Sequence, residues 1–258
     1  MTVVDKAHLT AGTMQYHIRL KPGDAARYVL LPGDPGRVLR IAQHLEGARE
    51  VMFHREYRTV TGTYRGIPVS AVSTGIDCPS TAIAVEELAN IGVTHFIRVG
   101  STGALQPDVE TGDIVINTAT MRKDGTTRFY VDDGFPAVAD HFLTHALIEA
   151  ARALQPERKY RLHIGLNASS DAFYGETPAV VARWSEHRLL NVEMESSAIF
   201  TIAHLRGLKA GMVCGVSGNL VTGDVEYQRE NARLIKAWED AIAIALDAIY
   251  RVEHLPAG

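Results

Sequence analysis

The sequence has few cysteines, no excess of one charge and no long hydrophobic run. Its 2 cysteines, Cys78 and Cys214, each lie in an apolar stretch, which predicts buried reduced thiols rather than a disulfide framework. Lysine and arginine total 26 against 30 acidic residues, which argues against nucleic acid as a partner. No segment approaches the roughly 18 apolar residues of a membrane span, and the first residues do not resemble a signal peptide. We therefore expect a cytoplasmic protein without a membrane partner.

The common signatures of nucleotide, hydrolase and metal sites are also missing. Neither G-x-G-x-x-G nor G-x-x-x-x-G-K-[ST] occurs. Ser217 lies in a near-match to the G-x-S-x-G nucleophile elbow, but Asn219 replaces the second glycine. His141 and His145 are one helical turn apart, without the H-E-x-x-H pattern or a third ligand, so a solvated helix face explains them better than a metal.

Short apolar runs alternate with helical patterns through most of the chain. Strands are expected at 28–31, 68–73, 96–99, 113–117, 163–167, 190–192 and 211–216, and helices at 79–90, 142–154, 197–205 and 226–250. The segment 51–73 differs, because consecutive strand-like pieces with Gly62 and Gly66 as turns predict an antiparallel element. This alternation predicts one α/β domain over residues 1–258, with helices on both faces of a sheet.

The first candidate site motif is LPGDPGR at 31–37, which follows a strand and opens a helix. Asp34 suits the N-cap and Pro35 the first helical position. Gly33 allows a ligand to approach the backbone, and Arg37 adds charge where a helix N-terminus already favours anions. An ordinary strand–turn–helix junction has a similar composition, so the motif alone does not establish a site.

A second motif begins at Arg98, at the end of an apolar strand, and continues to Ser101. A buried arginine is unfavourable unless it meets a carboxylate or phosphate oxygen, and ligands of open α/β sheets bind beyond the carboxyl ends of strands. The alternative is a purely structural ion pair.

A third motif, Glu193-Met194-Glu195, lies at a strand-to-helix junction. Carboxylates accept hydrogen bonds from sugar hydroxyls, and methionine offers a soft apolar surface to a ribose face. The helix dipole would account for one acid but not for the triplet. Together with Arg37, Arg55 and Arg98, this motif indicates a phosphate site beside a sugar site, and hence phosphorolysis or phosphoribosyl chemistry.

In this order and over essentially the whole chain, the motifs resemble the nucleoside phosphorylase I superfamily, and its uridine-cleaving branch most closely. The resemblance is carried by LPGDPGRV at 31–38, FHREY at 53–57, STGIDCPSTAIAVEEL at 73–88, IRVGSTGALQPDVETGDIVI at 97–116, FPAVAD at 135–140, SSDAFY at 169–174 and VEMES at 192–196. It implies a central mixed β-sheet flanked by helices.

The resemblance also implies the site residues. Phosphate would be held by Gly33, Arg37, Arg98 and Ser101, with Arg55 reaching in from a neighbouring subunit. Ribose would be held by Met194 and Glu195, with His17 contributed across the same interface. The base pocket would comprise Thr102, Gly103, Phe173 and Glu193. Arg98 and Glu195 would carry the catalysis.

Assembly and cofactors are implied in the same way. The family suggests a homo-oligomer, a hexamer built as a trimer of dimers, in which each dimer completes two shared active sites. Inorganic phosphate is the expected co-substrate of the nucleoside, and no cofactor is required. A monovalent cation, potassium, is implied at the dimer interface near Glu56 and Ser73.

The chain departs from the family pattern where the base is read. The uridine enzymes carry a glutamine and an arginine soon after the pair that here is Phe173-Tyr174, and the purine relatives carry an aspartate where Gly218 stands. Both signatures are missing, and Glu176 or Asn219 could take their place. Asp77 also stands where the family has glycine, and an acid near phosphate is unfavourable unless it is paired.

Four functional hypotheses follow. The first is a phosphorylase of uridine or another pyrimidine nucleoside, and the second a phosphorylase of purine nucleosides or methylthioadenosine. The third is a nucleosidase that uses water, although it would not need Arg37, Arg55 and Arg98. The fourth is a non-catalytic nucleoside-binding relative.

Overall fold

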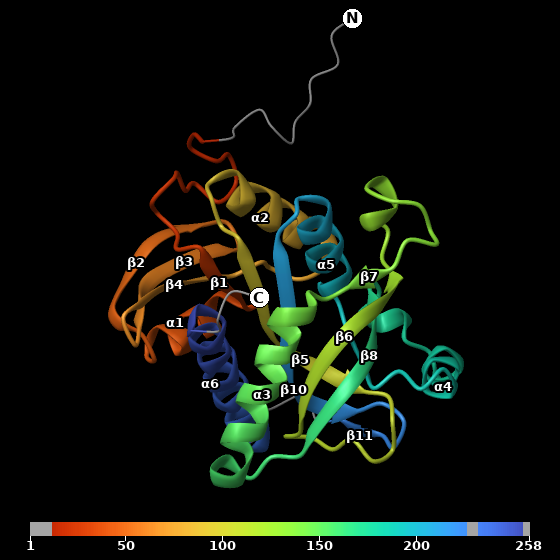
Figure 1. Ribbon diagram of the computed structural model, residues 1–258. Coiled ribbons are helices and arrows are strands. Elements are labelled where there is room, and N and C mark those ends of the chain that lie inside the picture. Colours follow the sequence, from red (N-terminus) through yellow and green to blue (C-terminus); the bar gives the residue numbers. More distant parts are fainter. Residues whose placement is uncertain (1–11, 226–231, 255–258) are drawn as a thin grey trace, which may run out of the picture.

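The computed structural model describes residues 12–225 and 232–254, which form one sheet of 11 strands with helices on both faces (Figure 1). The strands are β1 (Tyr28–Leu31), β2 (Glu46–His54), β3 (Tyr57–Tyr64), β4 (Ile67–Val72), β5 (His95–Ala104), β6 (Ile114–Lys123), β7 (Ala137–Val138), β8 (Leu162–Ser170), β9 (Asn191–Glu193), β10 (Lys209–Asn219) and β11 (Asp224–Val225). The helices are α1 (Pro35–Ala42), α2 (Cys78–Asn90), α3 (His141–Arg158), α4 (Pro178–Glu186), α5 (Ser196–Leu205) and α6 (Ala232–His254). Two short 3-10 turns are η1 (Thr127–Phe129) and η2 (Phe173–Gly175).

Two hydrophobic clusters fill the space on either side of the sheet. Helices α1, α3 and α6 pack on one face, and α2 and α5 on the other (Figure 1). Successive side chains of β1 alternate between them, with Leu30 in the first cluster and Val29 and Leu31 in the second. This alternation is the period of a strand covered on both faces. The expected α/β fold, a mixed sheet flanked by helices, is therefore confirmed.

The sheet closes on itself around β5. Strand β5 pairs with β1 and β10 in parallel and with β9 antiparallel. The path continues from β10 through β6 and β8 to β9, so β5, β10, β6, β8 and β9 form a closed ring. Strands β1, β4, β3 and β2 extend from β5 as an open arm. Because Leu31 lies beside Arg98 in the β1–β5 register, the start of α1 is brought to the end of the apolar part of β5.

The antiparallel element expected at 51–73 is present, but one of its turns was misplaced. Strand β3 pairs antiparallel with both β2 and β4. Gly62 lies inside β3 opposite Val69, whereas the turn is made by Arg65 and Gly66, both with positive φ. A side chain at Gly62 would place its Cβ 2.9 Å from the carbonyl oxygen of Glu46. The glycine is therefore required for close approach of β2, not for a turn.

Other differences concern the extent of elements. Helix α4 and the first half of β2 were not predicted, and β5 and β10 run several residues beyond their expected ends. The expected beginning of the last helix at Glu226 lies outside the described residues, while its apolar stripe, including Trp238, Ile242 and Ile249, is buried as predicted.

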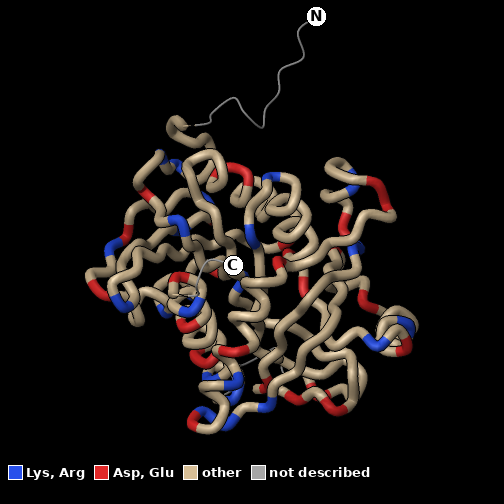
Figure 2. Tube along the Cα trace, viewed as in Figure 1, with Lys and Arg blue, Asp and Glu red and all other residues tan. Residues whose placement is uncertain are grey.

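Charge is distributed without a dominant sign. Figure 2 shows basic and acidic residues scattered together along the trace, in keeping with the formal net charge of -4. Within the described part of the chain, no helix combines the length and apolar character needed to cross a bilayer.

Candidate active site

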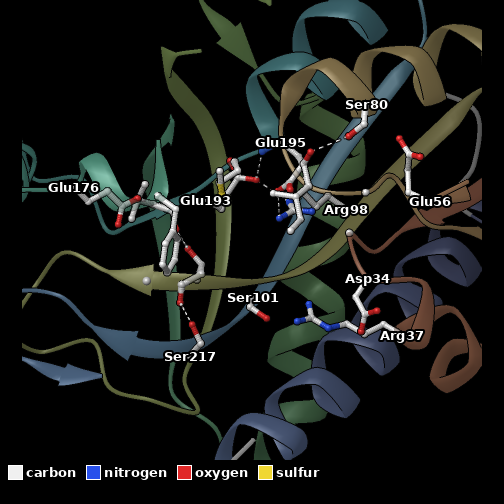
Figure 3. Close-up of a pocket in the computed structure, with 18 of the residues that line it drawn as sticks. Asp34, Arg37, Glu56, Ser80, Arg98, Ser101, Glu176, Glu193, Glu195 and Ser217 are labelled. Carbon is white, nitrogen blue, oxygen red and sulfur yellow. Dashed lines mark hydrogen bonds and ion pairs between the residues drawn. The ribbon is translucent and has the colours of Figure 1, made fainter. Parts of the chain in front are cut away.

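A cavity of about 790 Å³ opens beyond the ends of β1 and β5, beside the starts of α1 and α5. Most of the residues expected in the site line this one cavity: Gly33, Arg37, Arg98, Ser101, Thr102, Gly103, Phe173, Glu193, Met194 and Glu195. Figure 3 shows Arg37 and Glu176 at opposite ends, with Arg98 and Glu195 between them. The three motifs identified separately in the sequence therefore meet at a single cavity.

Arg98 lies at the centre of the cavity and pairs with two carboxylates. Its Nε is 2.7 Å from Oε2 of Glu193, and its Nη2 pairs with Oε2 of Glu195. All three side chains are buried. The third nitrogen, Nη1, is also buried and has no hydrogen-bond partner among the described residues. Arg98 therefore forms the ion pairs that the structural alternative predicted. Its Nη1 group is still able to donate to a further acceptor, such as an anion.

The electrostatics of this triad keep Arg98 charged. Burial disfavours its positive charge, but the carboxylates of Glu195 and Glu193 outweigh burial and raise the pKa of Arg98 above its ordinary value. Burial raises the pKa of Glu195, and the neighbouring Arg98 opposes that rise. A fixed positive charge is thereby placed in a buried site, where hydrogen bonds to an anion are strongest.

Glu193 braces the triad through the start of α5. Its Oε2 accepts hydrogen bonds from the backbone N–H groups of Glu195 at 2.9 Å and Ser196 at 3.0 Å, and its Oε1 accepts from the Ser196 hydroxyl. The two backbone donors are N–H groups of a helix N-terminus that have no partner within the helix, which explains why an acid is favourable there. The Glu193 carboxylate is already bound by these groups and by Arg98. A contact between Glu193 and the base remains a prediction.

Asp77, the residue before α2, contacts Glu195. Its backbone N–H donates to Oε1 of Glu195 at 3.0 Å, and this contact accompanies a φ of 80°, a conformation that non-glycine residues rarely adopt. Its side chain accepts from Cys78 N at the start of α2. Burial, followed by a hydrogen bond with Asp171, raises the pKa of Asp77 to about 7. This acid, expected near phosphate, is thus paired with another carboxyl group rather than with a cation.

The start of α1 forms one end of the cavity. The helix begins at Pro35, as predicted, and the Asp34 side chain accepts from Gly36 N at 2.8 Å. A Cβ at Gly33 would come within 3.1 Å of the Gly75 carbonyl oxygen, so only glycine fits without a shift. Arg37 and Ser101 share this end (Figure 3), which combines a helix N-terminus, a guanidinium and a hydroxyl. Such a combination suits an anion.

Glu176 lies at the other end of the cavity, with Phe173 nearby in the same segment. Burial raises the pKa of Glu176 to about 7. Asn219, the other candidate for reading the base, does not line the cavity. Its amide donates to the carbonyls of Gln106 and Val109, both at 2.8 Å, and its oxygen accepts from two backbone N–H groups. Asn219 is therefore structural.

The residues expected from a neighbouring subunit lie outside the cavity of their own chain. Arg55 is exposed at the turn between β2 and β3, with a φ of 57°. His17 pairs with Glu87 through an Nδ1–Oε1 distance of 2.6 Å. Glu56 does line the cavity, and its carbonyl accepts from the hydroxyl of Ser73. The cation expected beside these two residues remains a prediction.

Several residues of the cavity were not predicted, among them Ile76, Ser80, Ser217 and Leu220. Ser217 was considered only as a nucleophile; its hydroxyl instead donates to the carbonyl of Thr102 at 3.1 Å. Ser217 could have been predicted from its place at the end of an expected strand. That strand, β10, lies beside β5, and its end also reaches the cavity.

Comparison with known proteins shows the family of the chain. The family model described as "Phosphorylase superfamily" matches residues 27–251. A uridine phosphorylase of Thermococcus kodakarensis is 52% identical over 239 residues, covering 88% of this chain and 85% of the relative. A guanosine phosphorylase of Halorubrum lacusprofundi is 40% identical, covering 91% and 98%.

Solved structures give the same result. A uridine phosphorylase of Vibrio fischeri has a TM-score of 0.84 at 31% identity, covering 92% of this chain and 97% of the other. A purine nucleoside phosphorylase of Toxoplasma gondii, solved with immucillin-H, has a TM-score of 0.85 at 30% identity, covering 93% and 98%. By its family match, its relatives and its fold, the chain belongs to the phosphorylase superfamily.

Proposed function

We propose that this protein is a nucleoside phosphorylase that converts uridine and inorganic phosphate to uracil and ribose 1-phosphate. The observation that carries the proposal is the buried, charged Arg98, whose Nη1 has no partner among the described residues. It lines the same cavity as the helix α1 start and Glu195. Hydrolysis by water would not require a buried guanidinium there, whereas phosphorolysis requires a bound anion beside the sugar.

The mechanism follows from the order of groups along the cavity. Gly33, Arg37, Ser101 and Arg98 hold phosphate, and Met194 and Glu195 hold the ribose, so that attack becomes effectively unimolecular. The bond between C1′ and the base nitrogen breaks with its electron pair leaving on the base, and a phosphate oxygen forms the new bond to C1′. Negative phosphate stabilises the positive charge that develops on the sugar. The base, which leaves as an anion or takes up a proton, lies near Phe173 and Glu176.

Glu176 is our candidate for the residue that recognises the base. A protonated carboxyl group offers one donor and one acceptor, which match the N3–H and adjacent carbonyl of uracil. A carboxylate offers only acceptors, which match the N1–H and amino group of guanine. The second candidate substrate, guanosine, is favoured by this chemistry and by the relative that acts on guanosine.

The pH dependence of the reaction tests this role. With the pKa of Glu176 raised to about 7, the O–H donor is present below that pH and lost above it. We expect kcat/KM for uridine to fall about tenfold between about pH 6 and about pH 8, the loss of one good hydrogen bond. Glu176→Gln keeps a donor and an acceptor at every pH, so its profile should be flatter. Phosphate ionises equally in the assays of the wild type and of Glu176→Gln, so the role of Glu176 is judged from the difference between the two pH profiles. Superimposable profiles would contradict the role.

The reaction itself is tested by a substrate panel. Uridine, thymidine, inosine, guanosine, adenosine and methylthioadenosine are each incubated with and without phosphate, and release of the free base is followed. We expect release from uridine only when phosphate is present. Release without phosphate would indicate a nucleosidase, and no release from any nucleoside would indicate a binding protein.

Assembly and location belong to the same proposal. We infer a cytoplasmic enzyme of nucleoside salvage that works as a hexamer of three dimers. Arg55 and His17 lie away from their own cavity, which supports their contribution to the site of a neighbouring subunit. A potassium ion near Glu56 and Ser73 would lie at that dimer interface. Size-exclusion chromatography with light scattering tests the assembly, and an active monomer would contradict it.

A further inference from the structure

One tryptophan contacts two residues of the proposed phosphate site. Trp238 lies on α6 and is 5% exposed. Its indole Nε1–H donates to Oγ of Ser101 at 2.9 Å, and the Cζ of Arg37 lies 4.1 Å from the centroid of its ring. Ser101 comes from β5 and Arg37 from α1, so a third element joins two parts of the cavity wall that are distant in sequence.

We propose that Trp238 is a positioning residue for phosphate, which fixes the hydroxyl of Ser101 and the guanidinium of Arg37 before phosphate binds. The inference rests on the proposed function, because it takes Arg37 and Ser101 as phosphate ligands. It gives α6, which carries none of the sequence motifs of the site, a part in binding the co-substrate.

The hydrogen bond to Ser101 sets the direction of its hydroxyl group. An indole N–H can only donate, so Ser101 Oγ must be the acceptor. The hydroxyl's own hydrogen is then left to be donated elsewhere, and Ser101 lines the cavity. A phosphate oxygen accepts such a hydrogen. Without the indole N–H, the hydroxyl could rotate and present a lone pair to the anion, which would repel it.

The ring restrains Arg37 in a similar way. A guanidinium over the face of tryptophan gains a cation–π attraction, which limits the rotamers of a long side chain. Ordering such a side chain on binding normally reduces affinity, so ordering it beforehand increases affinity for the anion. Both effects act on phosphate rather than on the nucleoside.

The experiment compares KM for phosphate with KM for the nucleoside. Trp238→Phe keeps an aromatic ring beneath Arg37 but removes the N–H donor, so we expect KM for phosphate to rise about three- to tenfold while KM for the nucleoside stays nearly unchanged. Trp238→Leu also loses the ring and should raise KM for phosphate further. Trp184→Phe is the matched control, because Trp184 is equally buried and packs on α4 in a cluster with Leu105 and Val181. It should leave KM for phosphate unchanged.

A double-mutant cycle separates positioning from packing. In the Ser101→Ala background the indole N–H has no acceptor, so adding Trp238→Phe should produce no further rise in KM for phosphate. Fully multiplicative effects, or an unchanged KM for phosphate in Trp238→Phe while Ser101→Ala raises it, would overturn the inference. If Ser101→Ala and Arg37→Ala both leave KM for phosphate unchanged, the proposed phosphate site itself is wrong.

Fluorescence provides a second measurement that needs no change at Trp238. The sequence has 2 tryptophans, so Trp238 is the single tryptophan of the Trp184→Phe variant, and its emission is followed by selective excitation of tryptophan. Titration with inorganic phosphate alone should change its emission with saturation near KM for phosphate, and Ser101→Ala should shift that midpoint to higher concentration. Emission that stays constant while phosphate supports turnover would overturn the inference.

Discussion

Replacement of Arg98 by alanine is expected to lower phosphate-dependent turnover about a thousandfold, the effect of removing a donor that acts on charge developing in the transition state. Arg98 is the buried cation between the proposed phosphate and ribose regions, and its Nη1 has no hydrogen-bond partner among the described residues. The measurement is kcat and KM for uridine at saturating phosphate. Near-normal turnover would mean that phosphate binds elsewhere.

The same change should also destabilise the fold. Without Arg98, the carboxylates of Glu193 and Glu195 remain buried without their partner, a loss that lowers the free energy of unfolding by about 3–5 kcal/mol. Thermal melting must therefore accompany the kinetics. Arg98→Lys is the matched control, because it keeps the charge without the planar group that contacts both carboxylates and an anion. It should melt closer to the wild type and still show at least about tenfold lower turnover.

A mixture of two inactive variants is expected to recover activity if the site is shared between subunits. One chain carries Arg37→Ala, which damages its own cavity, and the other carries Arg55→Ala, which damages its neighbour's. In a mixed dimer one site contains both defects and the other contains neither. With equal co-expression and random pairing, half of the dimers are mixed, so about a quarter of wild-type activity should return.

The control for this experiment pairs Arg37→Ala with Ser101→Ala. Both residues line the cavity of their own chain, so no site in the mixed dimer is intact. That mixture should show only the residual activity of the parents. An equal lack of recovery in the Arg37→Ala and Arg55→Ala mixture would place Arg55 outside the site.

Much of the site could be predicted because its residues lie at element boundaries with local chemical rules. Asp34 and Pro35 predicted the start of α1, and the structure confirms it. An arginine ending an apolar strand had to meet an oxygen, and Arg98 does so. Caps and strand periods depend on neighbours within a few residues, so a single sequence shows them.

The remaining features depend on contacts between distant segments. Trp238 has the spacing of a core residue, and only the packing of α6 against β5 and α1 shows its contacts with Ser101 and Arg37. Gly62 has the composition of a turn, but the approach of β2 requires it inside a strand. Asp77 was expected to be unfavourable near phosphate unless paired, and only the fold brings its partner Asp171 beside it. The spacing of residues along the sequence does not show which distant segments come into contact.

The closed ring of strands also affects whether the candidate site unfolds locally or only together with the whole domain. Strand β5, which carries Arg98 and Ser101, is hydrogen-bonded to β10 throughout its length, to β1 at its start and to β9 at its end. A strand that is bonded on both sides at its start and at its end cannot fray from either end, so its amide protons exchange with solvent mainly through larger opening events. Heat inactivation should therefore coincide with global unfolding rather than precede it, and activity would report directly on the fraction of molecules that remain folded.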